Sequence, residues 1–233
     1  MLPIKGEHVF SPVSIGPIQG CDFLFASKIS ENIEAYTTIP STWCSLIAIG
    51  SSTGGTEALS EILANLKPPL PPVMVVQHIS ATFSRLFAAR LDKECELTVK
   101  EAMEGEYAKP NTIYIAPGDK HMSITGSPSS ICIHCKAGER IHGVLSSADV
   151  LFESVAKVIG NKAVGVILTG MGVDGAAKLL AMRQAGARTL GQDEATCVVY
   201  GMPKAAFNMG AVERQVGLQD MATEITKLVY PGR

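Results

Sequence analysis

A short apolar run that leads directly into a Ser/Thr/Gly cluster constrains this chain more than any other feature. Residues 46–56 read LIAIGSSTGGT, and the overlapping segment TEALSEILANL carries apolar residues at helical spacing. The pattern predicts a buried strand, a tight turn and an amphipathic helix. In an open parallel sheet, such a turn lies where ligands bind. The unpaired backbone N–H groups that open the helix favour a negative charge there. We therefore expect the functional site at this turn.

Strands and helices alternate along the rest of the chain. Apolar runs bounded by turn residues predict strands at residues 73–77, 97–101, 113–116, 163–168, 188–191 and 212–216. Helical spacing predicts helices at residues 82–93, 148–159, 176–185, from 203, and at 220–228. Residues 121–125 and 131–135 have the pattern of a β-hairpin. Together these units predict an α/β fold: a doubly wound, mostly parallel sheet flanked by helices, with an antiparallel β-hairpin.

The composition fits one large hydrophobic core. The 233 residues are 46% hydrophobic and 18% charged, enough for one good-sized domain with a short appendage. A formal net charge of −2, without a Lys/Arg-rich run, gives no basis for nucleic-acid binding. Without a membrane-spanning or signal-like segment, we expect a soluble, cytoplasmic protein. Residues 1–44 lack a clear periodicity, and we interpret them as an N-terminal extension of unknown role before one domain at residues 45–233.

Three predicted strands are followed by side chains that acyl transfer requires. Residues 50–54 match G-x-S-x-G, which places the Ser52 hydroxyl on a strand-to-helix turn. His78 comes directly after one strand, and Asp174 follows another. A serine nucleophile needs a general base at neutral pH, and the imidazole needs an acid that orients it. Because parallel strands end at the same edge, we expect Ser52, His78 and Asp174 to meet there as nucleophile, base and orienting acid.

Each of these residues also has a purely structural interpretation. Ser52 and Asp174 could cap the helices that follow them, and His78 could be a surface histidine. Four other histidines compete for the role of base, and His121 is the only one of them in a suitable position. For each residue alone the structural interpretation is favoured, whereas their convergence on one edge favours the triad. The chain order Ser, His, Asp differs from that of α/β-hydrolases and argues against that superfamily.

Two ligand-binding interpretations fit the sequence less well. The segment SSTGGTEA also resembles a flavodoxin phosphate loop, which would bind FMN at the switch point of the sheet. Flavodoxin-type proteins need aromatic residues grouped around the flavin. The candidates here show no such grouping: Trp43, Tyr107, Tyr114 and Tyr200. Cys132 and Cys135 lack the second CxxC that a zinc site would need. We expect neither a cofactor nor a metal.

Six segments in collinear order resemble successive motifs of the catalytic domain of chemotaxis protein-glutamate methylesterases, the CheB family. They are GSSTGGTEAL, VVQHISATFSRLFAARLD, IYIAPGDKHM, ADVLFESVA, GVILTGMGVDGAAKLLAM and GQDEATCVVYGMPKAA. The resemblance covers about residues 46–229. It implies a serine hydrolase that removes methyl groups from γ-glutamyl methyl esters on the cytoplasmic helices of chemoreceptors and releases methanol. Many members of the family also deamidate selected glutamines there.

The resemblance also implies roles for individual residues. It makes Ser52 the nucleophile, His78 the base and Asp174 the orienting acid, the same three residues that the strand ends select. Thr53 and the backbone N–H of Met171 match positions that surround the nucleophile and its oxyanion. A non-catalytic adaptor of the same fold, which binds receptor helices, stays an alternative because residue types alone do not establish activity.

The chain departs from the family pattern at two places. The family usually has an N-terminal phosphoacceptor receiver domain, and the roughly 44 residues before the catalytic region are too few for one. We therefore expect either a constitutive esterase or control by a separate receiver protein. Leu145, Ser146 and Ser147 stand where the family usually has an R-P-S-like triplet. We expect this variation to affect receptor docking and to leave the triad intact.

Overall fold

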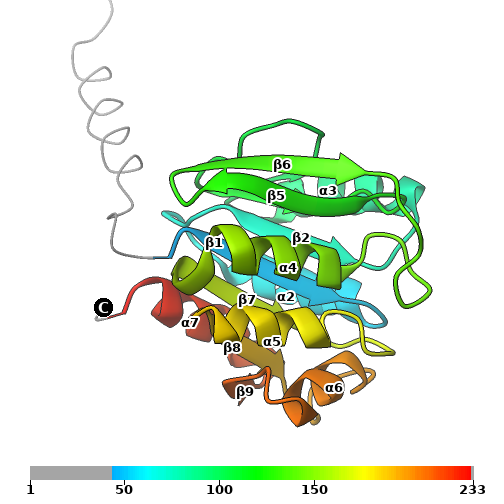
Figure 1. Ribbon diagram of the computed structural model, residues 1–233, viewed down its shortest axis with the longest axis vertical. Helices are drawn as coiled ribbons and strands as arrows, with labels where there is room; N and C mark the ends of the chain where they lie inside the picture. Colours follow the sequence, from blue (N-terminus) through cyan, green and yellow to red (C-terminus); the bar gives the residue numbers. More distant parts are fainter. Residues whose placement is uncertain (1–43, 232–233) are drawn as a thin grey trace, which may run out of the picture. The chain divides into compact units, whose positions relative to one another are not determined.

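A seven-stranded parallel sheet forms the centre of the domain (Figure 1). The computed structural model describes residues 44–231, so the predicted N-terminal extension lies almost wholly outside the described residues. The strands are β1 (Leu46–Ser51), β2 (Val73–Gln77), β3 (Thr98–Glu101), β4 (Thr112–Ile115), β7 (Ala163–Ile167), β8 (Arg188–Gln192) and β9 (Arg214–Val216). Their order across the sheet is β3-β4-β2-β1-β7-β8-β9, and every paired strand runs parallel to its neighbour.

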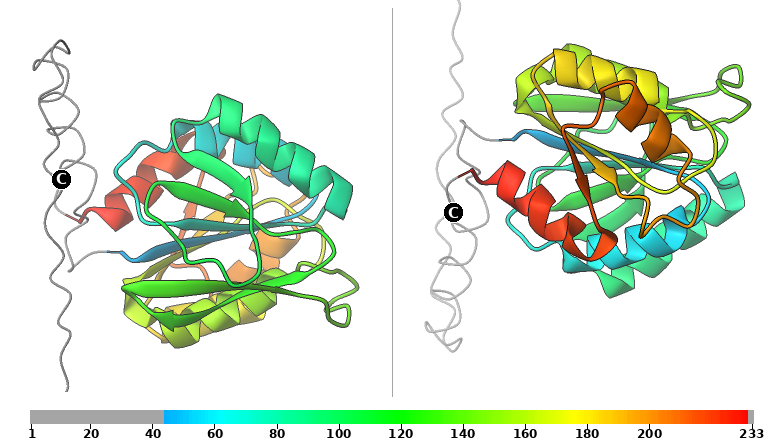
Figure 2. Two further views of the ribbon diagram at one scale, coloured as in Figure 1. Left: turned by 90° about the horizontal axis from the view of Figure 1, so that it is seen from above. Right: turned by 90° about the horizontal axis from the view of Figure 1, so that it is seen from below.

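Helices cover both faces of this sheet (Figure 2). They are α2 (Gly55–Asn65), α3 (Ala81–Glu94), α4 (Ala148–Val158), α5 (Ala176–Gln184), α6 (Met202–Asn208) and α7 (Leu218–Val229), with a short 3-10 helix η1 at Gly160–Lys162. One face is covered by α2, α3 and α7, and the other by α4, α5 and α6. An antiparallel hairpin of β5 (His121–Ser127) and β6 (Ser130–Lys136) packs against α4. None of the helices between residues 44 and 231 combines the length and apolar character that crossing a bilayer requires.

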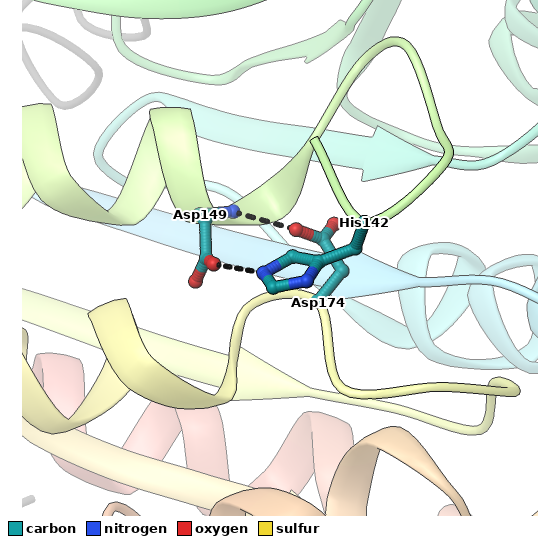
Figure 3. Close-up of side chains that lie close together, drawn as sticks. All are labelled: His142, Asp149 and Asp174. Carbon is teal, nitrogen blue, oxygen red and sulfur yellow. Dashed lines mark hydrogen bonds and ion pairs between the residues drawn. The ribbon is translucent and has the colours of Figure 1, made fainter. Parts of the chain in front are cut away.

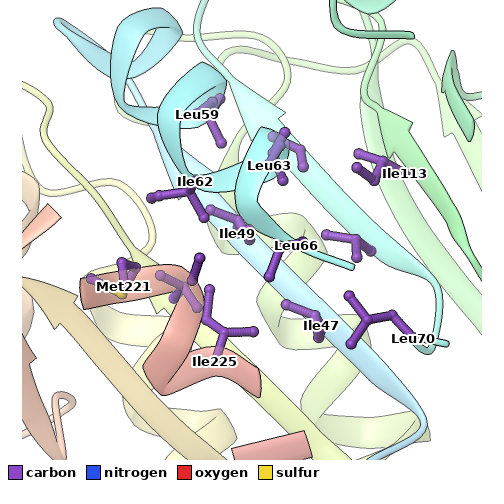
Figure 4. Close-up of a cluster of buried hydrophobic side chains, with 14 of the residues drawn as sticks. Ile47, Ile49, Leu59, Ile62, Leu63, Leu66, Leu70, Ile113, Met221 and Ile225 are labelled. Atoms are coloured by element: carbon purple, nitrogen blue, oxygen red, sulfur yellow. The ribbon is translucent and has the colours of Figure 1, made fainter. Parts of the chain in front are cut away.

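The two faces of the sheet have separate hydrophobic cores. Alternate residues of β1 point to opposite sides of the sheet. Ile47 and Ile49 pack against α2 and α7 (Figure 4), whereas Leu46 and Ala48 belong to the core on the side of α4. Every residue of β1, β2, β4 and β7 is buried. Burial on both faces explains why these strands appear in the sequence as continuous apolar runs instead of alternating patterns.

The sheet has a topological switch point between β1 and β7. The helix that follows β1, α2, lies on one face, and the helix that follows β7, α5, lies on the other. Loops that leave adjacent strands toward opposite faces open a crevice at their carboxyl ends. We call this edge of the sheet, where β1, β2 and β7 end, the carboxyl rim.

Helix α4 approaches the carboxyl rim closely because Gly50 has no side chain. A Cβ atom at Gly50 would lie 2.8 Å from the Cβ of Ala148, the first residue of α4, and 3.2 Å from the ring of Phe152. The glycine of the G-x-S-x-G pattern therefore lets the start of α4 pack onto the end of β1.

The predicted fold class is confirmed, and most element boundaries agree within two residues. The last strand is shorter than predicted, because pairing with β8 is limited to Arg214–Val216. Val212, which precedes this strand, is not paired in the sheet and belongs to the same buried cluster as residues of α6. The last helix begins at Leu218, two residues early, because Gly217 already has the extended backbone of a helix cap.

Substitution of Gly50 by Ala should separate α4 from β1. We expect Gly50→Ala to lower the free energy of unfolding by about 2–3 kcal/mol, because the added methyl group overlaps Ala148. Urea unfolding measures this change. Gly105→Ala is the control: nothing lies within 4 Å of its Cβ position, and only its positive φ of 78° opposes the substitution, at about 1 kcal/mol. Equal losses in the two variants would contradict the close packing at Gly50.

Candidate active site

Ser52 lies in a turn that is held on both sides. Its backbone N–H donates to the carbonyl of Thr169 at 3.0 Å, and its carbonyl accepts from the Gln77 side-chain amide at 2.8 Å. Gly54 has a φ of 77°, and Gly55 begins α2 directly behind the serine. The half-buried Ser52 side chain thus lies at the N-terminus of a helix at the carboxyl rim.

The Gln77 side chain forms hydrogen bonds with both Ser51 and Ser52. Its Oε1 accepts from the Ser51 hydroxyl at 2.7 Å, while its Nε2 donates to the Ser52 carbonyl. A Cβ atom on Gly55 would overlap this amide, which explains the second glycine of the turn. Gln77 was not predicted from the sequence. The available signal was a polar residue, here 2% exposed, at the end of the apolar strand VMVVQ.

His78 is placed next to this turn by strand register. Ser51 pairs with Gln77 in the sheet, so Ser52 and His78 occupy the next positions of two adjacent strands. The His78 backbone N–H donates to the Ser51 carbonyl at 3.2 Å. The imidazole Nε2 lies 2.9 Å from Oδ2 of Asp174. This bond leaves Nδ1 as the nitrogen available to accept a proton. Among residues 44–231, no hydrogen bond joins the Ser52 hydroxyl to His78.

Asp174 is buried where its loop meets the start of α4. Its side chain is 3% exposed. Besides His78, it accepts hydrogen bonds from the Ser147 hydroxyl at 2.5 Å and from the backbone N–H groups of Ala148 at 2.7 Å and Asp149 at 3.3 Å. Burial by itself raises the pKa of Asp174, but the hydrogen bonds from His78, Ser147 and Ala148 outweigh it and lower the pKa. The carboxylate is therefore held as an anion.

Thr53 and Met171 lie beside Ser52 from two different loops. A Cβ atom on Gly170 would lie 2.7 Å from that of Ser52, so the loop after β7 passes directly against the serine. The Thr169 hydroxyl donates to the Thr53 carbonyl at 2.9 Å. Within the described residues, the backbone N–H groups of Thr53 and Met171 make no hydrogen bond. Two free donors near a serine hydroxyl form an arrangement that can bind an oxyanion.

A second histidine–carboxylate pair lies beside Asp174 (Figure 3). His142 Nε2 lies 2.9 Å from Oδ2 of Asp149, and potential ligand atoms of His142, Asp149 and Asp174 lie within 4.8 Å of one another. Such a group could hold a metal ion. Both oxygens of Asp174 already accept hydrogen bonds, however, from His78 and from the start of α4. The arrangement therefore suits a hydrogen-bonded carboxylate better than a metal ligand.

The other histidines of the described chain have partners of their own. His121 accepts a hydrogen bond from the Ser147 backbone N–H at Nδ1, 3.2 Å away, and contacts the Glu139 carbonyl through Nε2 at 2.8 Å. His134 lies between Thr125 and Glu104 on the surface. His121 was the other candidate for the general base. It does not contact Asp174 directly, because Ser147 lies between them, and both of its ring nitrogens already have hydrogen-bond partners.

Two of the aromatic residues considered for a flavin site have hydroxyls that are bonded elsewhere in the described part of the chain. Tyr114 is 1% exposed, and its hydroxyl accepts from the Lys109 backbone N–H. The Tyr200 hydroxyl pairs with Gln215, and Trp43 lies outside the described residues. The FMN interpretation is therefore not favoured.

The cysteines of the hairpin also give no sign of reactivity. Burial raises the pKa of Cys135 to about 12, as is typical of an unreactive thiol.

The fold and the rim together define an α/β domain with serine, histidine and aspartate gathered where β1, β2 and β7 end. A family model described as CheB methylesterase matches residues 47–225, and the chain belongs to this family. The crystal structure of the Thermotoga maritima CheB methylesterase catalytic domain superposes with a TM-score of 0.76 at 36% identity. That match covers 79% of this chain and 98% of the Thermotoga chain.

Curated relatives carry the name protein-glutamate methylesterase/protein-glutamine glutaminase. The protein of that name numbered 1 from Caulobacter vibrioides is 53% identical over 189 residues, which are 81% of this chain and 55% of the relative. The Salmonella typhimurium protein is 50% identical over 188 residues, again 81% of this chain and 54% of the relative. The chain thus spans about half the length of the curated relatives it matches.

The lowered pKa of Asp174 predicts a specific loss of stability in acid. Between the ordinary carboxyl pKa of 3.8 and the lower folded value, the unfolded chain binds a proton that the folded chain does not. Stability contributed by Asp174 is therefore present above this range and is lost as the pH falls through it. Urea unfolding between about pH 5 and pH 3 should show a shallower pH dependence in Asp174→Asn than in the wild type. Ser60→Ala, a substitution on α2 that changes no carboxylate, should keep the wild-type slope.

Proposed function

We propose that this protein is a serine hydrolase that removes methyl groups from glutamate γ-methyl esters on the cytoplasmic helices of chemoreceptors and releases methanol. The observation that carries the proposal is the 2.9 Å bond between His78 and Asp174 next to the Ser52 turn. An imidazole that is oriented by a buried carboxylate, and that stands opposite a serine on the adjacent strand, is the arrangement that acyl transfer needs. Family membership and the names of the relatives support the same activity.

In the proposed mechanism, Ser52 is the nucleophile and His78 the general base. The Ser52 hydroxyl attacks the ester carbonyl while Nδ1 of His78 takes its proton, and the N–H groups of Thr53 and Met171 bind the oxyanion. His78 then protonates the departing methanol, and water repeats the sequence to release the glutamate. Each oxyanion donor of this kind is worth roughly 3–4 kcal/mol of barrier. Asp174 stays ionised throughout and holds the imidazole.

The same groups can hydrolyse a glutamine amide. The tetrahedral intermediate would be bound in the same way, and ammonia would leave in place of methanol after protonation by His78. The names of the curated relatives include protein-glutamine glutaminase. We therefore include deamidation of receptor glutamines in the proposal.

Exposed apolar side chains beside the triad suit a helical protein substrate. Met171 is 74% exposed, Val173 51% and Val198 69%, and Val198 lies against Gly54 of the serine turn. An amphipathic receptor helix could lay its apolar face on these side chains and present a modified glutamate to Ser52. We propose that the protein acts in the cytoplasm, where such helices lie.

Removing the serine hydroxyl tests the mechanism. We expect Ser52→Ala to lower methanol release from a methyl-labelled chemoreceptor by roughly 10⁴-fold or more, because the hydroxyl that forms the acyl-enzyme is removed. Counting volatile methanol measures the rate, and circular dichroism checks the fold. Ser60→Ala, which removes a hydroxyl from α2 away from the rim, should keep wild-type turnover. Near-normal turnover in Ser52→Ala would rule out the serine mechanism.

Changing the orienting carboxylate gives a second test. We expect Asp174→Asn to lower kcat by roughly 10³–10⁴-fold, because an amide facing His78 favours the wrong tautomer of the imidazole. Steady-state kinetics on the same labelled receptor provides the measurement. An unchanged kcat would remove Asp174 from the triad.

The same assay tests the alternative of a non-catalytic adaptor. If the wild-type protein bound the receptor but released no methanol, the protein would be an adaptor and not a hydrolase.

A further inference from the structure

Ser147 contacts the carboxylate that orients the imidazole. It is the cap residue of α4 and is fully buried. Its hydroxyl accepts from the Asp149 backbone N–H at 3.2 Å and donates its own proton to Oδ1 of Asp174 at 2.5 Å. His78 binds the other oxygen, Oδ2. Ser147 and His78 therefore hold opposite oxygens of one carboxylate.

His121 holds Ser147 from the opposite side. Because the Ser147 backbone N–H is a donor, Nδ1 of His121 must carry a lone pair, and the ring proton lies on Nε2, which donates to the Glu139 carbonyl at 2.8 Å. A neutral imidazole of defined tautomer thus fixes the main chain at Ser147. The chain of contacts runs from Glu139 through His121 and Ser147 to Asp174 and His78.

The residue before Ser147 is in an unfavourable conformation. Ser146 has a φ of 60°, in the left-handed region that residues other than glycine seldom adopt. It is fully buried, and its hydroxyl has no hydrogen-bond partner among the described residues. Strain and an unsatisfied polar group at one residue persist only where the surrounding contacts compensate for them. Here the compensating contacts are those of Ser147 with His121 and Asp174.

We propose that Ser147 is a positioning residue of the hydrolase, which fixes the rotation of the Asp174 carboxylate so that Oδ2 faces His78. The proposal rests on the proposed function. The expectation that variation in the Leu145–Ser147 segment affects receptor docking stays a prediction. The other titratable groups around this carboxylate are His78, Asp149 and, through Asp149, His142.

Two substitutions separate this role from simple helix capping. Ser147→Ala removes both the donor and the cap, whereas Ser147→Gly removes the donor and keeps most of the capping free energy. We expect both variants to lower kcat for methanol release about tenfold with an unchanged KM, because a charge-assisted hydrogen bond is lost. Ser147→Thr retains the hydroxyl and should restore kcat. Ser146→Ala, which removes the neighbouring hydroxyl without a partner, is the matched control and should behave as the wild type.

The titration of Asp174 provides a measurement that does not depend on turnover. Carbon-13 NMR of the aspartate carboxyls should show the pKa of Asp174 rising in Ser147→Ala and Ser147→Gly, because one of the donors that lower it is gone. An unchanged Asp174 titration in both variants would overturn the proposal. If the wild type released no methanol, the proposed function would be refuted. The NMR comparison would still test whether Ser147 donates a hydrogen bond to Asp174.

Discussion

The site depends on one buried anion, the carboxylate of Asp174. A carboxylate removed from water without partners would cost several kcal/mol. Here the His78 imidazole and three donors at the start of α4 compensate for that cost. The positive end of the helix dipole adds to the stabilisation. The interactions that make burial of Asp174 possible also orient it toward His78, so docking of α4 and assembly of the rim depend on each other.

The topology explains how distant segments reach this anion. Strand β1 pairs with both β2 and β7, although the 85 residues 78–162 separate β2 from β7 in the chain. Parallel pairing places the carboxyl ends of all three strands on one edge. Helix α4 follows the β5–β6 hairpin and packs its first turn over the end of β1, where Gly50 leaves room for it. The hairpin and the glycine are thus as much a part of the site as the loops that carry its side chains.

Hydrogen bonds from two neighbouring segments hold the backbone of the serine turn. Gln77 and Thr169 bind the backbone on either side of the turn, so the hydroxyl at position 52 is carried by a fixed main chain. Within residues 44–231 the backbone N–H groups of Thr53 and Met171 have no hydrogen-bond partner, and in the proposed mechanism they bind the developing negative charge. Preorganised donors of this kind need no rearrangement as charge develops, which is the basis of their contribution to catalysis.

The sequence by itself determined the fold class and the three strand ends that carry Ser52, His78 and Asp174, because burial on both faces and strand-to-helix turns leave strong local patterns. Only the tertiary structure decided what surrounds those residues. The contacts of Gln77 with Ser52, and of Ser147 with Asp174 and His121, join segments more than 20 residues apart. A buried glutamine at a strand end or a helix-capping serine is common in many folds, so neither shows in advance which partner its side chain meets. These partners are set by tertiary packing, which brings the start of α4 to the end of β1.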